Sequence, residues 1–211
     1  MKISHKKTKM ILFIPGTARD FHPKFSLKQT QIDLVEETKL LGVIIRSDLS
    51  WSSNTEYIVT RANKKLWFLR KLKVLGANQK DLKEVYIKQI RSIVEFAVHN
   101  LITVEQRVDI ERIKKSALHI ILGDKYHSYS SAHKCVGLDT LFRRRQRLCT
   151  TFARRCFKND KFKNWFKPFT KTSQTRQQGR RLCDVHSRTM RFERSPISYI
   201  TELLNRLKNI K

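Results

Sequence analysis

The sequence lacks long hydrophobic runs. Its longest purely apolar run extends from Met10 to Ile14, and Pro15 follows it directly. A membrane-spanning helix needs about 20 apolar residues. The run is also short for the hydrophobic part of a signal peptide, and no small-residue cleavage site follows it. We therefore expect a protein that is neither transmembrane nor secreted and that resides in the nucleus or the cytoplasm.

Glycine and proline are scarce as well, at 6 and 4 of 211 residues. Their scarcity excludes the fibrous and low-complexity classes, which are built on these residues. Hydrophobic residues make up 40% of the chain. That share is enough to bury a core, so wholesale disorder is not expected.

Cysteine is equally rare, and its four positions contain no Cys-x-x-Cys pair. Cys149 and Cys156 lie on one face of a predicted helix, so buried thiols are the simple explanation. A zinc site would have to join two distant pairs, His133 with Cys135 and Cys183 with His186. No finger pattern connects them, and we expect neither a metal nor another cofactor.

Acidic residues are few, and their deficit defines the chain. There are 18 Asp and Glu against 45 Lys and Arg, which gives a net charge of +27. The excess rises from +4 over residues 1–50 to +10 over residues 158–211, and apolar residues run through every part. Such a charge repels itself unless an anion offsets it. We therefore expect a folded, basic body whose partner is nucleic acid; the other anionic partners are a membrane surface, which we do not favour, and acidic proteins.

The periodicity predicts an α+β protein that is mainly α. Short apolar segments at Lys9–Ile14 and Lys39–Ile45 predict strands, with the second packed on the first. From Trp51 onward, apolar residues recur at helical spacing. We predict a short β-hairpin or sheet over 1–50, an antiparallel helical bundle over 51–158, and a basic segment over 159–211 that ends in a helix.

Capping residues bound the predicted helices. These helices are 54–76, one that begins after Asn78, one between Thr103 and Gly123, 139–157, and one that begins at Ser195-Pro196. The inward residues predicted after Asn78 are Leu82, Val85, Tyr86, Gln89, Ile90 and Ile93. Those predicted for 139–157 are Leu141, Leu148, Phe152 and Cys156.

No motif points to catalysis. Two-metal polymerases and nucleases need close carboxylates, but the only adjacent acidic pair is Glu36-Glu37. The phosphate-binding loop, Gly-x-Ser-x-Gly and His-Glu-x-x-His motifs do not occur in the chain. We predict that the protein is not an enzyme as it stands and has no catalytic residues.

Two helical faces carry the candidate binding residues. Lys64, Trp67 and Lys71 lie opposite the apolar face of 54–76, where cations can follow phosphates and a ring can stack on a base. The alternative is that the lysines are merely solvated and Trp67 packs on a neighbouring segment.

On 139–157, the outward line is Arg143, Arg147 and Arg154. For Arg143, Arg144, Arg145 and Arg147 together, phosphate contact and plain solvation remain open, with a nuclear-import signal as a third alternative. The basic, aromatic-containing stretch after Asn159 is a further candidate for an arm that orders on nucleic acid.

An ordered series of segments resembles one known family. In chain order, the segments are Lys7–Phe13, Lys39–Trp51, Ala62–Arg70, Tyr86–Ala97, Ile110–Gly123, Gly137–Leu141, Arg143–Arg145 and Ser195–Ile197. Their order resembles that in the C-terminal part of non-LTR retrotransposon reverse transcriptases. The resemblance covers nearly the whole chain. It implies the end of a palm, a helical thumb and a basic C-terminal segment.

In that family the thumb grips the template-primer duplex, and a Lys-Thr pair lies beside the nucleotide site. The resemblance implies this position for Lys7. The Asp-Asp box and the fingers of the family have no counterpart in this sequence. We expect a non-catalytic part of such a polymerase that binds RNA or RNA–DNA duplex, with the remainder of the polymerase as a further partner. The alternatives are a decayed retrotransposon product without activity and a small basic adaptor for acidic proteins.

Overall fold

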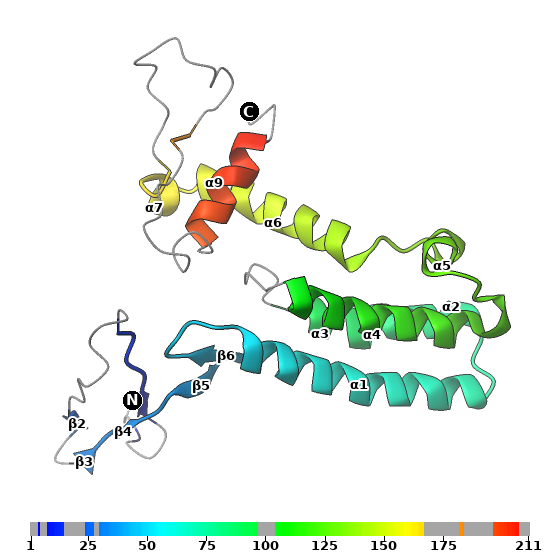
Figure 1. Cartoon of the computed structure of the whole chain (residues 1–211), viewed down its shortest axis with the longest axis horizontal. Coiled ribbons are helices and arrows are strands. Elements are labelled where there is room, and N and C mark those ends of the chain that lie inside the picture. The colour runs from blue at the N-terminus through cyan, green and yellow to red at the C-terminus, as the bar shows by residue number, and fades with distance from the viewer. Residues whose placement is uncertain are drawn as a thin grey trace, which may run out of the picture. The chain divides into compact units, whose positions relative to one another are not determined.

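The computed structural model describes residues 4, 8–14, 24–27, 30–96, 104–166, 182–183 and 196–206. The chain divides into two compact units, Met1–Thr60 and Arg61–Lys211, and each is described by itself. The described residues are mainly helical, with short strands in the N-terminal part (Figure 1). The predicted mainly α class with a small N-terminal sheet is thereby confirmed. The boundaries predicted after residues 50 and 158 stay predictions.

The described strands of the first unit form three two-stranded ladders. β1 (Lys9–Met10) pairs in parallel with β4 (Asp33–Leu34). The antiparallel pairs are β2 (Ser26–Leu27) with β3 (Thr30–Gln31), and β5 (Glu37–Leu40) with β6 (Val43–Arg46).

The β5–β6 hairpin corrects the strand predicted over Lys39–Ile45. This stretch folds back at Leu41 and Gly42, which have φ of 49° and 88°. A two-residue hairpin turn with two positive φ values matches the right-handed twist of its strands, and glycine adopts such a φ without steric penalty. The partner of β1 is also different from the prediction, because β1 pairs with Asp33–Leu34. β1 itself is shorter than the predicted Lys9–Ile14.

The hairpin is joined by hydrogen bonds to the start of α1 (Ser52–Val74). The Ile44 N–H donates to Asn54 Oδ1 at 3.0 Å, and the Arg46 Nη1 donates to Ser53 Oγ at 3.2 Å. Asn54 and Thr55 are both buried. A buried amide needs a partner, and the strand supplies it here, so β6 and the first turn of α1 are held together.

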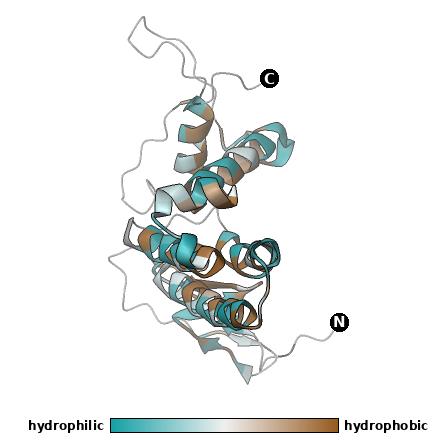
Figure 2. Ribbon diagram, turned by 90° about the vertical axis from the view of Figure 1, so that its right-hand side faces the viewer, coloured by the Kyte–Doolittle hydropathy of each residue, from teal (hydrophilic) through white to brown (hydrophobic). Residues whose placement is uncertain are grey.

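The second unit contains the remaining turns of α1, and its core is helical. Ala62, Leu66 and Leu69 on α1 are buried. α2 (Gln79–Val85) begins after Asn78, whose Oδ1 accepts the Asp81 N–H at 2.9 Å, which confirms the predicted cap. The brown and teal segments in Figure 2 show how hydrophobic and hydrophilic residues alternate along these helices.

A π-helical segment (Tyr86–Arg91) follows α2 and leads into α3 (Ser92–Glu95). The buried residues are Leu82, Tyr86, Ile90 and Val94, one every four positions. The predicted Gln89 is exposed, and Ile93 is less buried than Val94. The π turn explains both departures, because its i→i+5 hydrogen bonds widen the turn and shift which residues face inward.

α4 (Val104–Leu122) is followed by a 3₁₀ turn (Gly123–Lys125) and by α5 (Tyr129–Val136). Along α4 the buried apolar residues are Ile110, Ile113, Ala117, Leu118, Ile121 and Leu122. A capping box between Ser128 and Ser131 begins α5, and Gly137 ends it at φ 64°. The Thr103 cap predicted for α4 lies outside the described residues.

α6 (Leu141–Lys158) is capped by Thr140, whose Oγ1 accepts the Arg143 N–H at 3.1 Å. α7 (Asp160–Lys163) and α9 (Pro196–Arg206) follow along the chain. The core between α6 and α9 comprises Ala153, Cys156, Phe166, Leu182, Ile200 and Leu204. Asn205 ties Leu182 to α9 with two hydrogen bonds, of 3.0 and 3.1 Å.

The four cysteines, all of which the structure describes, form no disulfide, and Cys149 and Cys156 are buried as predicted. The inward prediction for Phe152 is wrong, because its side chain is exposed and Ala153 is buried in its place. Of the helices the structure describes, none combines the length and the apolar character that crossing a membrane requires.

Candidate nucleic-acid interface

α6 is the most cationic element of the described chain. It carries seven Lys and Arg residues and no Asp or Glu. One side buries Leu141, Cys149, Ala153 and Cys156. The predicted outward line, Arg143, Arg147 and Arg154, is exposed along the other side. The helix therefore exposes a row of guanidinium groups to solvent, and the buried residues on its opposite side pack in the core.

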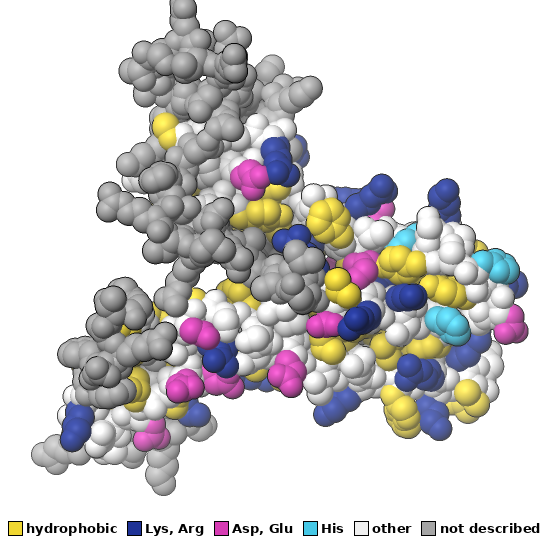
Figure 3. All heavy atoms as spheres, viewed as in Figure 1, with side chains coloured by type: hydrophobic (Ala, Val, Ile, Leu, Met, Phe, Trp, Pro, Cys, Tyr) yellow, Lys and Arg dark blue, Asp and Glu magenta, His cyan; other side chains and the backbone are white. Residues whose placement is uncertain are grey.

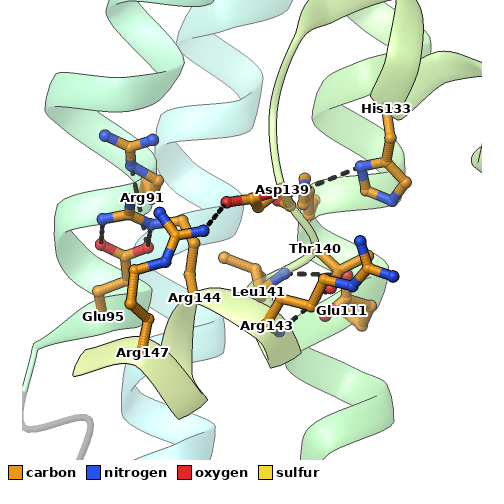
Figure 4. Close-up of polar contacts among 11 residues, drawn as sticks. Arg91, Glu95, Glu111, His133, Asp139, Thr140, Leu141, Arg143, Arg144 and Arg147 are labelled. Atoms are coloured by element: carbon orange, nitrogen blue, oxygen red, sulfur yellow. Dashed lines mark hydrogen bonds and ion pairs between the residues drawn. The ribbon is translucent and has the colours of Figure 1, made fainter. Parts of the chain in front are cut away.

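The arginines of α6 differ in their partners. Arg144 Nη2 donates to Glu95 Oε2 at 2.9 Å, and its Nε donates to Glu95 Oε1, so the pair is bidentate. Arg91 Nε lies 3.9 Å from the same carboxylate. Figure 4 shows both guanidinium groups directed at Glu95. The bond to Glu95 raises the pKa of Arg144, and the pair fixes α6 to α3.

Arg147 also has a carboxylate partner, but an exposed one. Its Nη2 donates to Asp139 Oδ2 (Figure 4), and about two thirds of its side chain is exposed. Exposed ion pairs of this kind contribute little to stability and exchange readily. Arg143 and Arg154 form no ion pair with a described side chain. Arg143, Arg147 and Arg154 are therefore available to an anion, whereas Arg144 is held in a structural contact.

The predicted residues of α1 also lie together. Lys64, Trp67 and Lys71 are exposed, and Lys71 Nζ lies 5.5 Å from the centroid of the Trp67 ring. The Trp67 side chain is 59% exposed, so it is not packed away on a neighbouring segment. An exposed aromatic ring beside an ammonium group is suited to stack on a base while the charge contacts a phosphate.

Lys7 lies outside the described residues, as does most of the basic stretch after Phe166. Within the described part, Figure 3 shows Lys and Arg side chains interspersed with hydrophobic ones over the helices. On this face of the second unit, basic side chains therefore lie among exposed apolar groups, with a few acidic side chains between them.

A cluster of buried and half-buried polar residues on α4 and α5 contacts the N-terminal end of α6. Lys114 on α4 is almost fully buried, and its Nζ contacts His133 Nδ1 at 3.1 Å and donates to the Asp139 carbonyl. Burial lowers the pKa of Lys114 to about 8. His133 Nδ1 also lies 3.0 Å from the Leu138 carbonyl. One ring nitrogen can accept from the Lys114 ammonium or donate to that carbonyl, but not both.

Glu111 completes the cluster. Its Oε1 accepts from the Tyr129 hydroxyl and, at 3.4 Å, from the Leu141 N–H at the first residue of α6. Burial and this carboxylate raise the pKa of Tyr129. Burial and the charge of Lys114 lower the pKa of His133. The cluster therefore joins α4, α5 and the N-terminus of α6 (Figure 4).

Glu95, Glu111 and Lys114 belong to this region although the sequence did not predict them. Lys114 had a visible signal, because it falls on the α4 face of Ile110, Ile113, Ala117 and Ile121. A lysine in an apolar row predicts a buried cation that must find acceptors. Glu95 had no such signal, because its main partner, Arg144, is 49 positions away.

No group of His, Cys, Asp and Glu within the described ranges has the arrangement of a metal site. His186, one residue of the zinc alternative, lies outside those ranges. Comparisons with protein families, curated proteins and solved structures find no match to this chain.

Proposed function

We propose that this chain binds duplex nucleic acid, RNA or RNA–DNA, mainly through phosphates, and that it acts as a binding element and not as a catalyst. The observation that carries the proposal is the exposed row Arg143, Arg147 and Arg154 on a helix without a single carboxylate. Affinity for nucleic acid comes largely from cations that displace condensed counterions from phosphates. A helix with fixed, exposed guanidinium groups supplies such cations.

The α1 face adds a second contact. Lys64 and Lys71 supply charge, and the half-exposed Trp67 ring supplies a stacking surface. We further propose that the helices over 51–158 form an antiparallel, thumb-like bundle, as in the non-LTR retrotransposon reverse transcriptases that the sequence resembles. In that reading α1 and α6 contact the template-primer duplex and Arg144 positions α6.

The test replaces three arginines of α6. The triple variant Arg143→Gln, Arg147→Gln, Arg154→Gln removes three exposed charges and leaves the buried face of α6 unchanged. We expect its affinity for a fluorescent RNA–DNA duplex at low salt to fall roughly tenfold or more, because phosphate contacts are lost. Fluorescence anisotropy measures the affinity, and circular dichroism checks that the variant is folded.

A matched control separates a local surface from overall charge. The triple variant Lys80→Gln, Lys125→Gln, Lys134→Gln also removes three exposed charges, but none lies on α1 or α6. It is expected to bind within about threefold of the wild type, since only long-range attraction is lost. Equal losses in the two variants would contradict a defined interface.

A further inference from the structure

A small cavity lies between α3, α4 and α6. Its lining includes the apolar side chains of Val94, Ile110, Leu141 and Phe142, with Arg107 and Arg145 among them. Its volume is about 30 Å³. That is room for roughly two water molecules and not for a nucleobase.

Arg145 occupies an unusual position on α6. It lies four residues after Leu141 and four before Cys149, and both of these neighbours are buried. Residues four apart share a helix face, so Arg145 stands in the apolar row and not in the outward line of Arg143 and Arg147. A guanidinium group in such a row loses hydration and needs an anionic partner.

The carboxylates at this cavity already have other partners. Glu95 binds Arg144 and lies beside Arg91, and Glu111 accepts from Tyr129 and from the Leu141 N–H. No carboxylate among the described side chains lies within ion-pair distance of Arg107 or Arg145. Burial and the positive charge of Arg107 lower the pKa of Arg145, and the weaker opposing effect of Glu111 does not offset them. The two guanidinium groups therefore repel each other.

We propose that Arg107 and Arg145 bind one phosphate group at the mouth of this cavity. Each guanidinium presents a planar fork of donors that matches two phosphate oxygens. A phosphate between the forks would offset both charges and direct water-sized oxygens into the cavity, while the exposed ring of Phe142 covers one side. The site depends on the proposed function only for the source of the phosphate, which is a nucleic-acid backbone or a free phosphate ion.

The first measurement uses inorganic phosphate and the full chain. At constant ionic strength, phosphate is expected to raise the wild-type Tm by a few degrees relative to chloride, because ligand binding to the folded state stabilises it. Arg145→Met keeps the apolar stem and removes the charge. We expect it to unfold in chloride at the wild-type temperature or above, and to gain nothing from phosphate. Equal phosphate stabilisation of both proteins would overturn the site.

The second measurement is a double-mutant cycle on duplex affinity. Arg107→Gln, which alters an exposed side chain, and Arg145→Met are each expected to weaken duplex binding roughly tenfold. If both residues hold the same phosphate, the double variant binds no more than about threefold more weakly than either single variant. Arg145→Met combined with Arg155→Met, on the same helix outside the cavity, should instead show additive losses.

The outcomes distinguish this site from the proposed function. Phosphate stabilisation that is lost in Arg145→Met, with a non-additive cycle, assigns the site to the nucleic-acid backbone. The same loss with unchanged duplex affinity assigns it to a free phosphate ion. Duplex binding by the wild type with an additive cycle and no phosphate effect overturns the site and leaves the proposed function standing. If Arg145→Met does not fold, Arg107→Gln and Arg145→Lys replace it in both measurements.

Discussion

Replacing Glu95 by glutamine is expected to lower the free energy of unfolding by about 2–3 kcal/mol. The Glu95 side chain is only 16% exposed, and Arg144 and Arg91 both direct their guanidinium groups at its carboxylate. A neutral amide leaves two partly desolvated cations without compensation, and that loss exceeds the value of the hydrogen bonds themselves. Urea unfolding followed by circular dichroism measures the difference.

The control for this prediction is Glu84→Gln. Glu84 forms an i,i+4 pair with Lys88, and more than half of each side chain is exposed. Such pairs contribute about 0.5 kcal/mol or less, so the control should unfold close to the wild type. If Glu95→Gln unfolds as close to the wild type as the control does, Arg144 is not held in a structural contact and belongs with the exposed arginines.

Lys114 is expected to make the chain more stable as the pH rises from about 8 to 10.5, whereas the buried thiols of Cys149 and Cys156, whose pKa values are raised by burial, act in the opposite direction. Burial lowers the pKa of Lys114 to about 8 in the folded chain, whereas the ordinary value is 10.5. In this window the unfolded chain binds more protons at this site than the folded chain, so deprotonation favours folding. The gain is on the order of 3 kcal/mol for the whole shift. Urea unfolding at a series of pH values at constant ionic strength measures it.

Two variants isolate Lys114 from the other groups that titrate in this range. Lys114→Met removes the buried ammonium, so its stability should rise less steeply with pH than that of the wild type. Lys115→Met alters the exposed lysine at the next position and should keep the wild-type slope. The ionisable groups that interact with Lys114 are those of Glu111, Asp139, Arg91, Arg144 and His133. If Lys114→Met retains the full slope, Lys114 is not its cause.

Local signals in the sequence were enough to predict the helices and several of their ends. Asn78 caps the helix that it was expected to cap, and Cys149 and Cys156 are buried. Capping depends on a side chain and a backbone N–H within one turn, so it can be read from adjacent residues. Helical amphipathicity is equally local, which explains why the outward line of α6 was predicted correctly.

Features that depend on an altered turn or on distant contacts were not predictable in this way. The π segment shifts the buried position from Ile93 to Val94, and no residue type within Tyr86–Arg91 predicts a π turn. The Leu41–Gly42 turn was hidden because a leucine occupies the first positive-φ position. Leu182 enters the core through its hydrogen bonds to Asn205, 23 positions away.

The candidate site also combines features that local sequence signals predict with features that depend on distant contacts. Exposure of Arg143, Arg147 and Arg154 followed from the helical period, whereas the pairing of Arg144 with Glu95 needed the folded chain. The placement of Arg145 in the apolar row could be read from its spacing to Leu141 and Cys149. That no carboxylate in the described part of the chain pairs with it could not be read, since this depends on how Glu95 and Glu111 are engaged on other helices.

The salt dependence of duplex binding tests the central claim most directly. The logarithm of the wild-type affinity is expected to fall linearly with the logarithm of salt concentration, by about 0.9 for each phosphate contacted on B-form DNA. The α6 triple variant should reduce that slope by roughly 2–3, one unit for each lost contact. Absence of binding at low salt, or an affinity that does not change with salt, would contradict phosphate binding and favour a basic adaptor for proteins.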